Sequence, residues 1–289
     1  MMNNILEIRG LTKSYPSFDL GPLNLAIPKG VIVGYIGENG AGKTTTIKLI
    51  MDLIREDEGE IQVFGMHMAQ DPKGIRSKIG VVFDDLNLPE DLCLSDVGLI
   101  CRQMFPHWDG DLFSSYQRVF KLEPKKRVKE LSRGMRMKLS IAIALSHGAE
   151  LLILDEPTSG LDPVIREEIL DILLEFIQEE NHAVLFSSHI LTDLEKIADY
   201  IALIHKGKLI FMEEKDVLRD EYAIYHSDPN RPYPFAEGVI LAERKHHYGD
   251  QILVKRSEVP RDLPLDRPSL EEIMLFFIKG GANDVSNGI

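Results

Sequence analysis

The chain has 289 residues, of which 44% are hydrophobic and 27% are charged, an ordinary composition for a globular protein with room for one large and one small domain. Its formal net charge of −13, from 33 basic and 46 acidic residues, argues against a general role in coating nucleic acid. The sequence contains no apolar run of about 18 residues, the length of a membrane span, and the N-terminus lacks the pattern of a secretory signal.

The first segments of the chain predict strands. Residues 5–9 and 23–27 alternate apolar and polar side chains, which is typical of half-buried strands, and the second segment stops at Pro28. The apolar run 31–36 follows and predicts a buried strand. We expect the first two strands to form an antiparallel pair ahead of the third.

Residues 37–44 read GENGAGKT and match the pattern G-x-x-x-x-G-K-[S/T] at every fixed position. The loop lies between the predicted strand 31–36 and a predicted helix over 45–54. A strand before the loop and a helix after it make a chance glycine-rich turn a poor explanation. The loop therefore predicts a nucleotide-binding site.

Glycines let the loop backbone curl so that successive N–H groups point inward, and the helix N-terminus adds partial positive charge. Lys43 adds a full charge, and the Thr44 hydroxyl is suited to hold Mg²⁺ beside the β- and γ-phosphates. The candidate nucleotide-binding residues of the loop are Gly37, Asn39, Gly40, Ala41, Gly42, Lys43, Thr44 and Thr45.

The middle of the chain alternates strand and helix patterns. This alternation favours a largely parallel α/β sheet with helices on both faces. A stretch of about 91–148 has no convincing strand and predicts a helical insertion. Further strands are predicted at 60–64, 79–83, 151–154, 183–187, 201–204 and 208–212.

The last part of the chain predicts a small α+β extension. Short strands are expected at 222–225, 238–244 and 251–256. Ser269 and Glu272 form a capping box for a terminal helix, whose apolar face we expect to pack on its own domain or on a second subunit. We therefore divide the chain into domains at 1–215 and 216–289.

Residues 151–156 read LLILDE, an apolar strand that ends in two carboxylates. Asp155 suits a Mg²⁺ partner, and Glu156 suits a general base that polarises the attacking water. Alone, such a pair is more often a polar turn. With a phosphate-binding loop in the same chain, the functional interpretation is favoured.

At this point the sequence resembles the ATP-binding-cassette (ABC) family over most of residues 2–215. Residues 131–135, LSRGM, resemble the signature sequence of that family, and residues 155–163, DEPTSGLDP, resemble its Walker B and D-loop run. Residues 187–189, SSH, resemble the switch histidine at a strand end, and Tyr15 stands where the family has an aromatic ring under adenine. The joint occurrence of these motifs in family order is highly specific.

The resemblance implies the P-loop NTPase fold of ABC ATPases, with ATP and Mg²⁺ bound between two subunits in a head-to-tail dimer. Ser132 and Gly134 of one subunit would reach the γ-phosphate held by the other, since they precede a predicted helix over 136–146. His189 would contact the γ-phosphate and help to hold the water that Glu156 polarises. Asp162 would communicate across the dimer and is also suited to cap the helix that begins at Pro163.

Three departures from the family pattern matter, of which one is that the C-terminal extension, 216–289, carries no family-wide motif. Asp84 stands where the family usually has Gln, and its carboxylate could hold Mg²⁺ or its water, so Asp84 joins Thr44 and Asp155 as a candidate metal ligand. The signature has Arg133 and Met135 where Gly and Gln are usual. The usual Gln links Mg²⁺ and water to the helical insertion in this family, so we expect Asp84 to alter that coupling.

The resemblance implies an ATPase subunit at the cytoplasmic face of the membrane that powers a separate integral membrane permease. Residues 82–85, 131–135 and 189–196 resemble subunits linked to multidrug or peptide-antibiotic export. Two alternatives stay open, a soluble ABC ATPase switch and a weakly hydrolysing nucleotide-dependent regulator. The transported substrate, its direction and the choice between homodimer and heterodimer do not follow from the sequence, and no nucleic-acid partner is expected.

Overall fold

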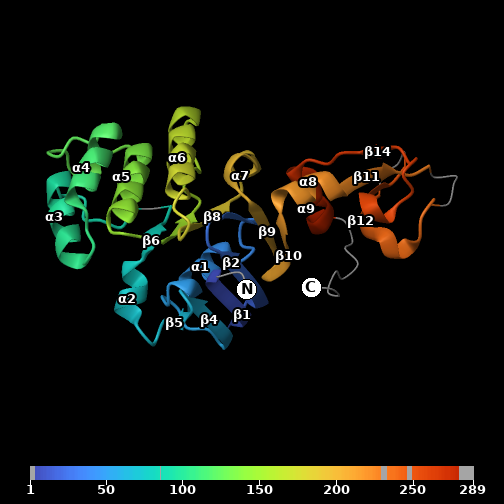
Figure 1. Ribbon diagram of the computed structural model, residues 1–289, viewed down its shortest axis with the longest axis horizontal. Helices are drawn as coiled ribbons and strands as arrows, with labels where there is room; N and C mark the ends of the chain where they lie inside the picture. The colour runs from blue at the N-terminus through green and yellow to red at the C-terminus, as the bar shows by residue number, and fades with distance from the viewer. Residues whose placement is uncertain (1–3, 85, 229–232, 246–248, 280–289) are drawn as a thin grey trace.

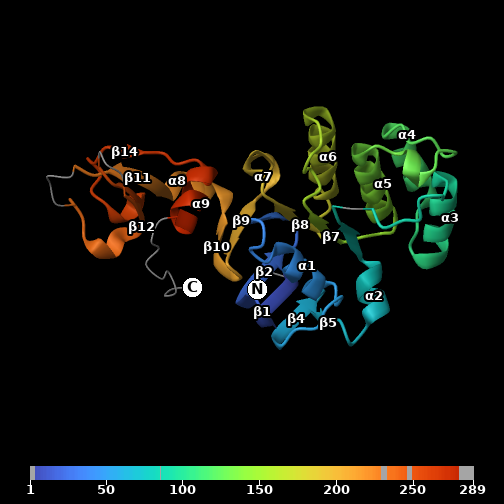
Figure 2. The same ribbon diagram turned by 180° about the vertical axis from the view of Figure 1, so that it is seen from behind.

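Three sheets organise the chain in the computed structural model, which describes residues 4–84, 86–228, 233–245 and 249–279. Figure 1 shows the helical insertion at one end of the molecule, the central sheet in the middle and the C-terminal extension at the other end. Figure 2 shows the same order from behind. In the part of the chain that is described, no helix is both long enough and apolar enough to cross a membrane.

The N-terminal sheet confirms the predicted antiparallel pair. β1 (Asn4–Tyr15) pairs antiparallel with β2 (Phe18–Pro28), and Tyr15 and Phe18 face each other where the two strands meet. The sheet has the order β2-β1-β4-β5, with β4 (Glu58–Val63) and β5 (Met66–His67) also antiparallel.

The central sheet has the order β10-β9-β3-β8-β7-β6 and confirms the predicted α/β class. All neighbouring strands are parallel except β10, which is antiparallel at one edge. Since β3, β8 and β7 are adjacent and parallel, the segments that follow them reach the same edge of the sheet. The strands are β3 (Ile32–Ile36), β6 (Ile79–Val82), β7 (Leu151–Asp155), β8 (Ala183–Ser188), β9 (Tyr200–His205) and β10 (Lys208–Glu214).

Helices cover both faces of the central sheet, as predicted. On one face α5 (Arg133–Ser146), α6 (Pro163–Phe176) and α7 (Leu191–Ile197) pack over buried side chains such as Phe186. The other face is shared by α1 (Lys43–Ile50), α2 (Pro72–Ser77) and the N-terminal sheet. The two apolar clusters make the sheet a rigid support for the loops at its edge.

The helix after the phosphate loop is shorter than predicted. We expected it to reach residue 54, but α1 ends at Ile50. Asp52 adopts a left-handed φ of +53°, and the N–H of Leu53 donates to the carbonyl of Lys48, a pattern that terminates helices. Ile54 still packs against the apolar cluster to which Ile47 and Ile50 of α1 belong, and this burial explains why Ile54 continues the apolar spacing of the helix.

The helical insertion contains α3 (Leu94–Met104), α4 (Gly110–Val119) and α5. Its described residues include one isolated bridge and no strand, as predicted. A short 3₁₀ turn, Val128–Glu130, precedes the signature residues. α5 begins earlier than expected because the Ser132 hydroxyl accepts a 3.3 Å hydrogen bond from the N–H of Met135, which caps the helix.

The C-terminal extension contains a small antiparallel sheet with the order β12-β13-β11-β14, preceded by one helix in the chain and followed by another. Ser269 and Glu272 form the predicted capping box, and the Phe277 ring lies 5.3 Å from that of Phe211 on β10. The terminal helix therefore packs within its own chain, against β10 of the central sheet as well as β12 of the extension. The elements are α8 (Lys215–Glu221), β11 (Tyr222–His226), β12 (Ile240–Arg244), β13 (Gln251–Lys255), β14 (Leu265–Asp266) and α9 (Leu270–Lys279), with 3₁₀ turns at Glu237–Val239 and Arg256–Glu258.

Two of these elements, α8 and β14, were not predicted. β14 has only two residues and exists through its pairing with β11, a contact that no local pattern records. Tyr222 and Phe276 belong to the apolar cluster of the central sheet, so the extension shares a core with the rest of the chain. The domain boundary at residue 215 stays a prediction.

Candidate nucleotide-binding and catalytic site

The phosphate loop depends on glycine at defined points. Gly40 and Gly42 have φ values of +82° and +115°, which other residues rarely adopt. A Cβ on Gly42 would lie 2.6 Å from the Leu20 side chain, and one on Gly37 would lie 2.4 Å from the carbonyl oxygen of Ile204. A side chain at Gly37 would collide with the backbone of β9, and one at Gly42 would strain a backbone conformation that favours glycine.

Two backbone hydrogen bonds at Ala41 hold the phosphate loop in its conformation. The N–H of Ala41 donates to the carbonyl of Glu38, and the carbonyl of Ala41 accepts from the N–H of Gly207. α1 follows at once, with Gly42 as an N-cap that has no side chain to satisfy the first N–H groups. These groups and the positive end of the helix dipole suit an anion.

Lys43 is buried, with 6% of its surface exposed, and its ammonium group is held by three oxygens. Nζ donates to the carbonyl of Gly37 at 2.7 Å and to that of Glu38 at 3.4 Å. It also lies 3.3 Å from Oε1 of Glu156, close enough for an ion pair although not aligned for a hydrogen bond. The charge is therefore fixed in place above the loop.

A cavity of about 470 Å³ opens in front of the loop, within the range of small-molecule sites. It brings together most of the loop residues predicted to bind a nucleotide with the predicted base, Glu156. The lining residues are Ser17, Phe18, Glu38, Asn39, Gly40, Gly42, Lys43, Thr44, Thr45 and Glu156.

The aromatic residue that lines this cavity is Phe18, which we did not predict. Tyr15 lies opposite Phe18 in the strand pair, is 40% exposed and has Lys13 Nζ 6.0 Å from its ring centre. The role of Tyr15 as an adenine platform stays a prediction. A second aromatic three residues after Tyr15 was the signal in the sequence that could have identified Phe18.

Asp155 connects the phosphate loop to the central sheet. Its Oδ2 accepts from the Thr44 hydroxyl at 2.8 Å, and its Oδ1 accepts from the Ser187 hydroxyl at 2.9 Å. Hydroxyl and carboxylate oxygens are the ligands that Mg²⁺ prefers, so this donor set fits the metal. Within the described ranges, no group of three or more His, Cys, Asp or Glu forms a separate metal site.

Ser187 is a site residue that sequence reasoning missed. The sequence contains it only as the first residue of the SSH run. Its position follows from the sheet, because Asp155 and Ser187 are register partners on the parallel strands β7 and β8. The buried hydroxyl fixes the orientation of the Asp155 carboxylate.

Glu156 and His189 are brought together at the same edge of the sheet. Oε2 of Glu156 lies 2.6 Å from Nδ1 of His189 and accepts a 3.3 Å hydrogen bond from its backbone N–H. Glu156 has a left-handed φ of +55°, a strain of about 1–3 kcal/mol that the surrounding contacts must offset. A carboxylate held between an ammonium group and an imidazole is suited to orient water and accept its proton.

The signature residues do not line this cavity. Ser132 is the exposed N-cap of α5, and a Cβ on Gly134 would lie 2.6 Å from the Ile165 side chain on α6. Asp162 caps α6 through 3.1 Å hydrogen bonds from two backbone N–H groups, which confirms its capping role. Asp84 forms an ion pair with Arg133, and its role as a metal ligand stays a prediction.

Comparison with known proteins identifies the family. A model of the ABC transporter family matches residues 20–159. BcrA of Bacillus licheniformis, a bacitracin transport ATP-binding protein, is 36% identical over 212 residues, or 72% of this chain and 69% of that protein. The chain belongs to the ABC transporter family. It is an ATP-binding subunit, an ATPase that energises transport.

Two further comparisons agree with this assignment of the ABC subunit. SrtF of Streptococcus pyogenes, a lantibiotic transport ATP-binding protein, is 36% identical over 214 residues, which cover 73% of this chain and 92% of that protein. The solved structure of an ATP-binding subunit of an ABC transporter has a TM-score of 0.69 at 28% identity and covers 74% of this chain and 92% of its own. The dimeric structure of the ATP-binding cassette MJ0796 bound to ADP and Pi has a TM-score of 0.65 at 24% identity and shares the fold of this chain.

Proposed function

We propose that this ABC subunit hydrolyses ATP with Mg²⁺ as one half of an ATP-sandwiched dimer and drives a separate integral membrane permease from the cytoplasmic face of the membrane. The proposal is supported by the fact that the predicted site residues lie in two separate places on the subunit. The cavity gathers the phosphate loop and Glu156, whereas Ser132 and Gly134 lie outside its lining. A second copy, turned head to tail, would supply them.

Within one subunit, Lys43 and the first N–H groups of α1 bind the phosphates. Thr44 and Asp155 would hold Mg²⁺, which would supply positive charge to neutralise the phosphates. Glu156 orients the attacking water and accepts its proton. His189 donates from Nδ1 to Glu156, and Nε2 could donate to the γ-phosphate when the ring carries a proton on both nitrogens.

Across the dimer, α5 of the partner subunit presents its N-terminus to the γ-phosphate. Ser132 contributes its hydroxyl and Gly134 its backbone N–H at the positive end of a 14-residue helix. Asp162, at the start of α6, would communicate between the two sites. Hydrolysis then depends on association of the two subunits, because neither subunit alone encloses the γ-phosphate.

Light scattering on the Glu156→Gln variant tests the sandwich. Removing the base leaves the phosphate-binding groups in place, so we expect ATP with Mg²⁺ to convert the variant to a species of twice the monomer mass. ADP should not, because it lacks the γ-phosphate. A variant that stays monomeric with ATP while the unaltered chain hydrolyses ATP as a monomer would refute the sandwich.

We further infer that the transport is export of peptide antibiotics. BcrA and SrtF, whose names state bacitracin and lantibiotic transport, support this inference. In the organism that carries the chain, replacing it with the Lys43→Ala variant should increase susceptibility to bacitracin or to a lantibiotic. Unchanged growth inhibition by both would refute the antibiotic assignment and leave the ATPase activity untouched.

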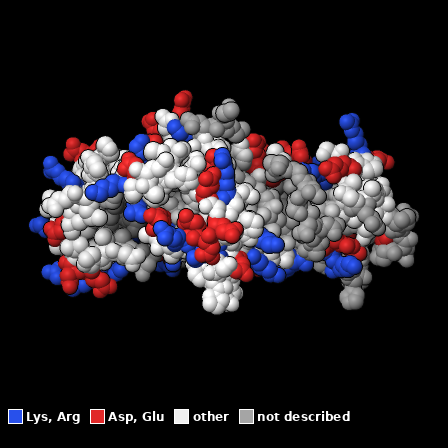
Figure 3. Space-filling view, turned by 90° about the horizontal axis from the view of Figure 1, so that it is seen from below, with Lys and Arg blue, Asp and Glu red and all other residues white. Residues whose placement is uncertain are grey.

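Nucleic acid is not expected as a partner. Figure 3 shows a face on which acidic and basic side chains are interspersed, with a group of acidic residues near its centre. This distribution agrees with the net charge of −13.

ATP turnover at background level would favour the alternative of a nucleotide-dependent regulator over the motor proposed here.

A further inference from the structure

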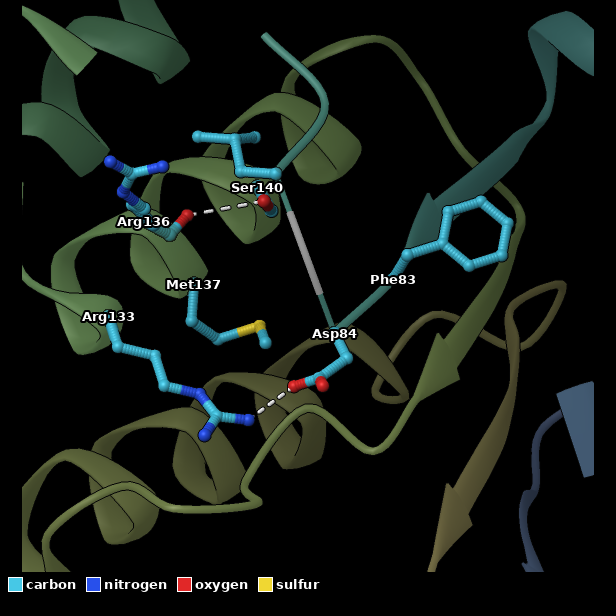
Figure 4. A pocket seen from close by; sticks show the side chains of 7 residues that line it. Phe83, Asp84, Arg133, Arg136, Met137 and Ser140 are labelled. Carbon is cyan, nitrogen blue, oxygen red and sulfur yellow. Dashed lines mark hydrogen bonds and ion pairs between the residues drawn. The ribbon is translucent and has the colours of Figure 1, made fainter. Parts of the chain in front are cut away.

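Two of the positions at which the sequence departs from the family pattern, Asp84 and Arg133, form an ion pair with each other. Nη2 of Arg133, in the signature sequence, lies 2.5 Å from Oδ1 of Asp84, which follows β6. The residues are 49 positions apart in the chain. Figure 4 shows the two side chains pointing toward each other across the cavity that they border.

The charges around Arg133 explain why this pair forms. Arg133 is the first residue of α5, the first turn of α5 has no acidic residue, and Arg136 lies one turn further along. Cations are unfavourable at a helix N-terminus because they face the positive end of the dipole. Asp84 therefore supplies a carboxylate that the helix itself lacks.

Arg133 also contacts the segment that leads to Asp162. A Cβ on Gly160 would lie 2.5 Å from Nη1 of Arg133, so the guanidinium group lies directly against that glycine. The group is thus held between the end of β6 and the D-loop. It links three segments to which the family resemblance assigns roles at the nucleotide or across the dimer.

The pair can open without disturbing the core. Arg133 is 51% exposed and Asp84 57% exposed, and they border a cavity of about 360 Å³ that Met137 and Ser140 of α5 also line. An exposed ion pair of this kind shifts an equilibrium by about two- to fivefold. Such a shift is small beside the free energy of folding, but it is measurable as a change in the ATP concentration at which two subunits associate.

We propose that Asp84 and Arg133 form an ionic latch that holds α5 to the end of β6 and opposes closure of the ATP sandwich. In the separate chain, Asp84 neutralises the charge beside Ser132 and Gly134. In the sandwich, the γ-phosphate held by the partner subunit competes with Asp84 for the same positive helix end. Asp84 and Arg133 are therefore positioning residues that set the ATP concentration at which closure occurs, and this role rests on the proposed sandwich.

The latch and the predicted metal role of Asp84 lead to opposite expectations. If Asp84 is a metal ligand, removing its carboxylate should raise the concentrations of ATP and Mg²⁺ at which the dimer closes. If Asp84 is part of a latch, removing its carboxylate should lower the ATP concentration for closure and leave the Mg²⁺ concentration unchanged. Measurements on the Glu156→Gln variant can distinguish these two roles.

The test adds Asp84→Asn to the Glu156→Gln variant and measures the dimer fraction in two titrations, one against ATP concentration at fixed Mg²⁺ and one against Mg²⁺ concentration at fixed ATP. The half-maximal ATP concentration should fall about two- to fivefold, because each subunit contributes one latch and binds one ATP. In a background that also contains Arg133→Gln, Asp84→Asn should have no further effect, since its partner is absent. Asp52→Asn is the matched control, because Asp52 forms an exposed ion pair with Arg76 away from the site, with exposed fractions of 52% and 46%.

Three outcomes would overturn the latch. An unchanged half-maximal ATP concentration in Asp84→Asn would show that the ion pair does not restrain closure. A higher ATP or Mg²⁺ requirement that persists with Arg133→Gln would assign Asp84 to the metal. Failure of the Glu156→Gln parent to dimerise at any ATP concentration would overturn the sandwich and the latch together, which distinguishes failure of the proposed function from failure of the latch alone.

Discussion

Thr44 and Asp155 lie 111 positions apart in the chain and are joined by a 2.8 Å hydrogen bond from Oγ1 to Oδ2. The bond connects the first turn of α1 to the end of β7, and Ser187 on β8 orients the same carboxylate. Three segments of the central fold thus place two oxygens where Mg²⁺ would be held beside the phosphates. The geometry follows from the order of the strands, because β3, β8 and β7 are neighbours.

The Thr44 hydroxyl is the first group to test. Thr44→Ala should raise the Mg²⁺ concentration for half-maximal ATP hydrolysis by about tenfold or more, because one of two protein oxygen ligands is lost. Thr44→Ser keeps the hydroxyl and should stay within about twofold of the unaltered chain. A Mg²⁺ titration of steady-state hydrolysis measures both. An unchanged Mg²⁺ requirement in Thr44→Ala would remove Thr44 from the metal site.

Lys43→Ala should weaken ATP binding by about thirtyfold or more, because truncating one member of a buried charged contact costs about 2–5 kcal/mol. Lys48→Ala is the control, since Lys48 is exposed in the last turn of the same helix. Isothermal titration calorimetry with ATP gives both affinities. Equal affinity in Lys43→Ala and the unaltered chain would refute the phosphate role of Lys43.

Glu156→Gln should slow hydrolysis by about a hundredfold or more, because an amide cannot accept the proton of the attacking water. ATP affinity should change little, since the phosphate-binding groups remain. Single-turnover hydrolysis measures the rate. Glu167→Gln, at an exposed position on α6, should leave the rate unchanged. Rapid hydrolysis in Glu156→Gln would mean that another group activates the water.

Tyr15→Ala should weaken ATP binding by about tenfold, because stacking on an aromatic ring contributes about 1–3 kcal/mol per base. Affinity for inorganic triphosphate, which has no base, should be unaffected. Phe18→Ala is the matched variant across the strand pair, at the ring that lines the cavity. If Phe18→Ala alone weakens ATP binding, Phe18 rather than Tyr15 is the adenine platform.

His147 should make stability depend on pH. Burial lowers its pKa below the ordinary value of 6.5, and its ring stacks on Phe105 at 4.4 Å with Nδ1 3.2 Å from the carbonyl oxygen of Ser77. The unfolded chain then binds a proton at higher pH than the folded chain does, so protonation favours unfolding. The stability that neutral His147 provides is complete above pH 6.5 and declines as pH falls from there toward the folded pKa.

Urea unfolding at about pH 7.5 and about pH 5.5 measures this effect as the change in midpoint between the two conditions. The unaltered chain should lose more stability on acidification than His147→Gln, whose amide does not titrate. Other groups titrate equally in both proteins and cancel in the comparison. Equal losses would mean that the pKa of His147 is not lowered.

Local patterns predicted the secondary structure wherever the cause of an element is local. The alternation at 5–9 and 23–27 predicted the β1–β2 pair, and the capping box at Ser269 predicted the start of the terminal helix. The end of α1 was misplaced because its apolar spacing continues to Ile54 past the left-handed turn at Asp52. β14 was missed because its two residues are a strand only through pairing with β11.

By itself, the sequence determined the chemistry of this protein. The loop at 37–44, the carboxylates Asp155 and Glu156 and the family order of the motifs identify an ATPase, because glycine spacing and residue type are properties of a short segment. Only the tertiary structure decided which distant groups meet. It joined Asp84 to Arg133, placed Ser187 behind Asp155 and put Phe18 into the cavity. Such contacts arise from strand order and helix packing over tens of residues, which no local periodicity records.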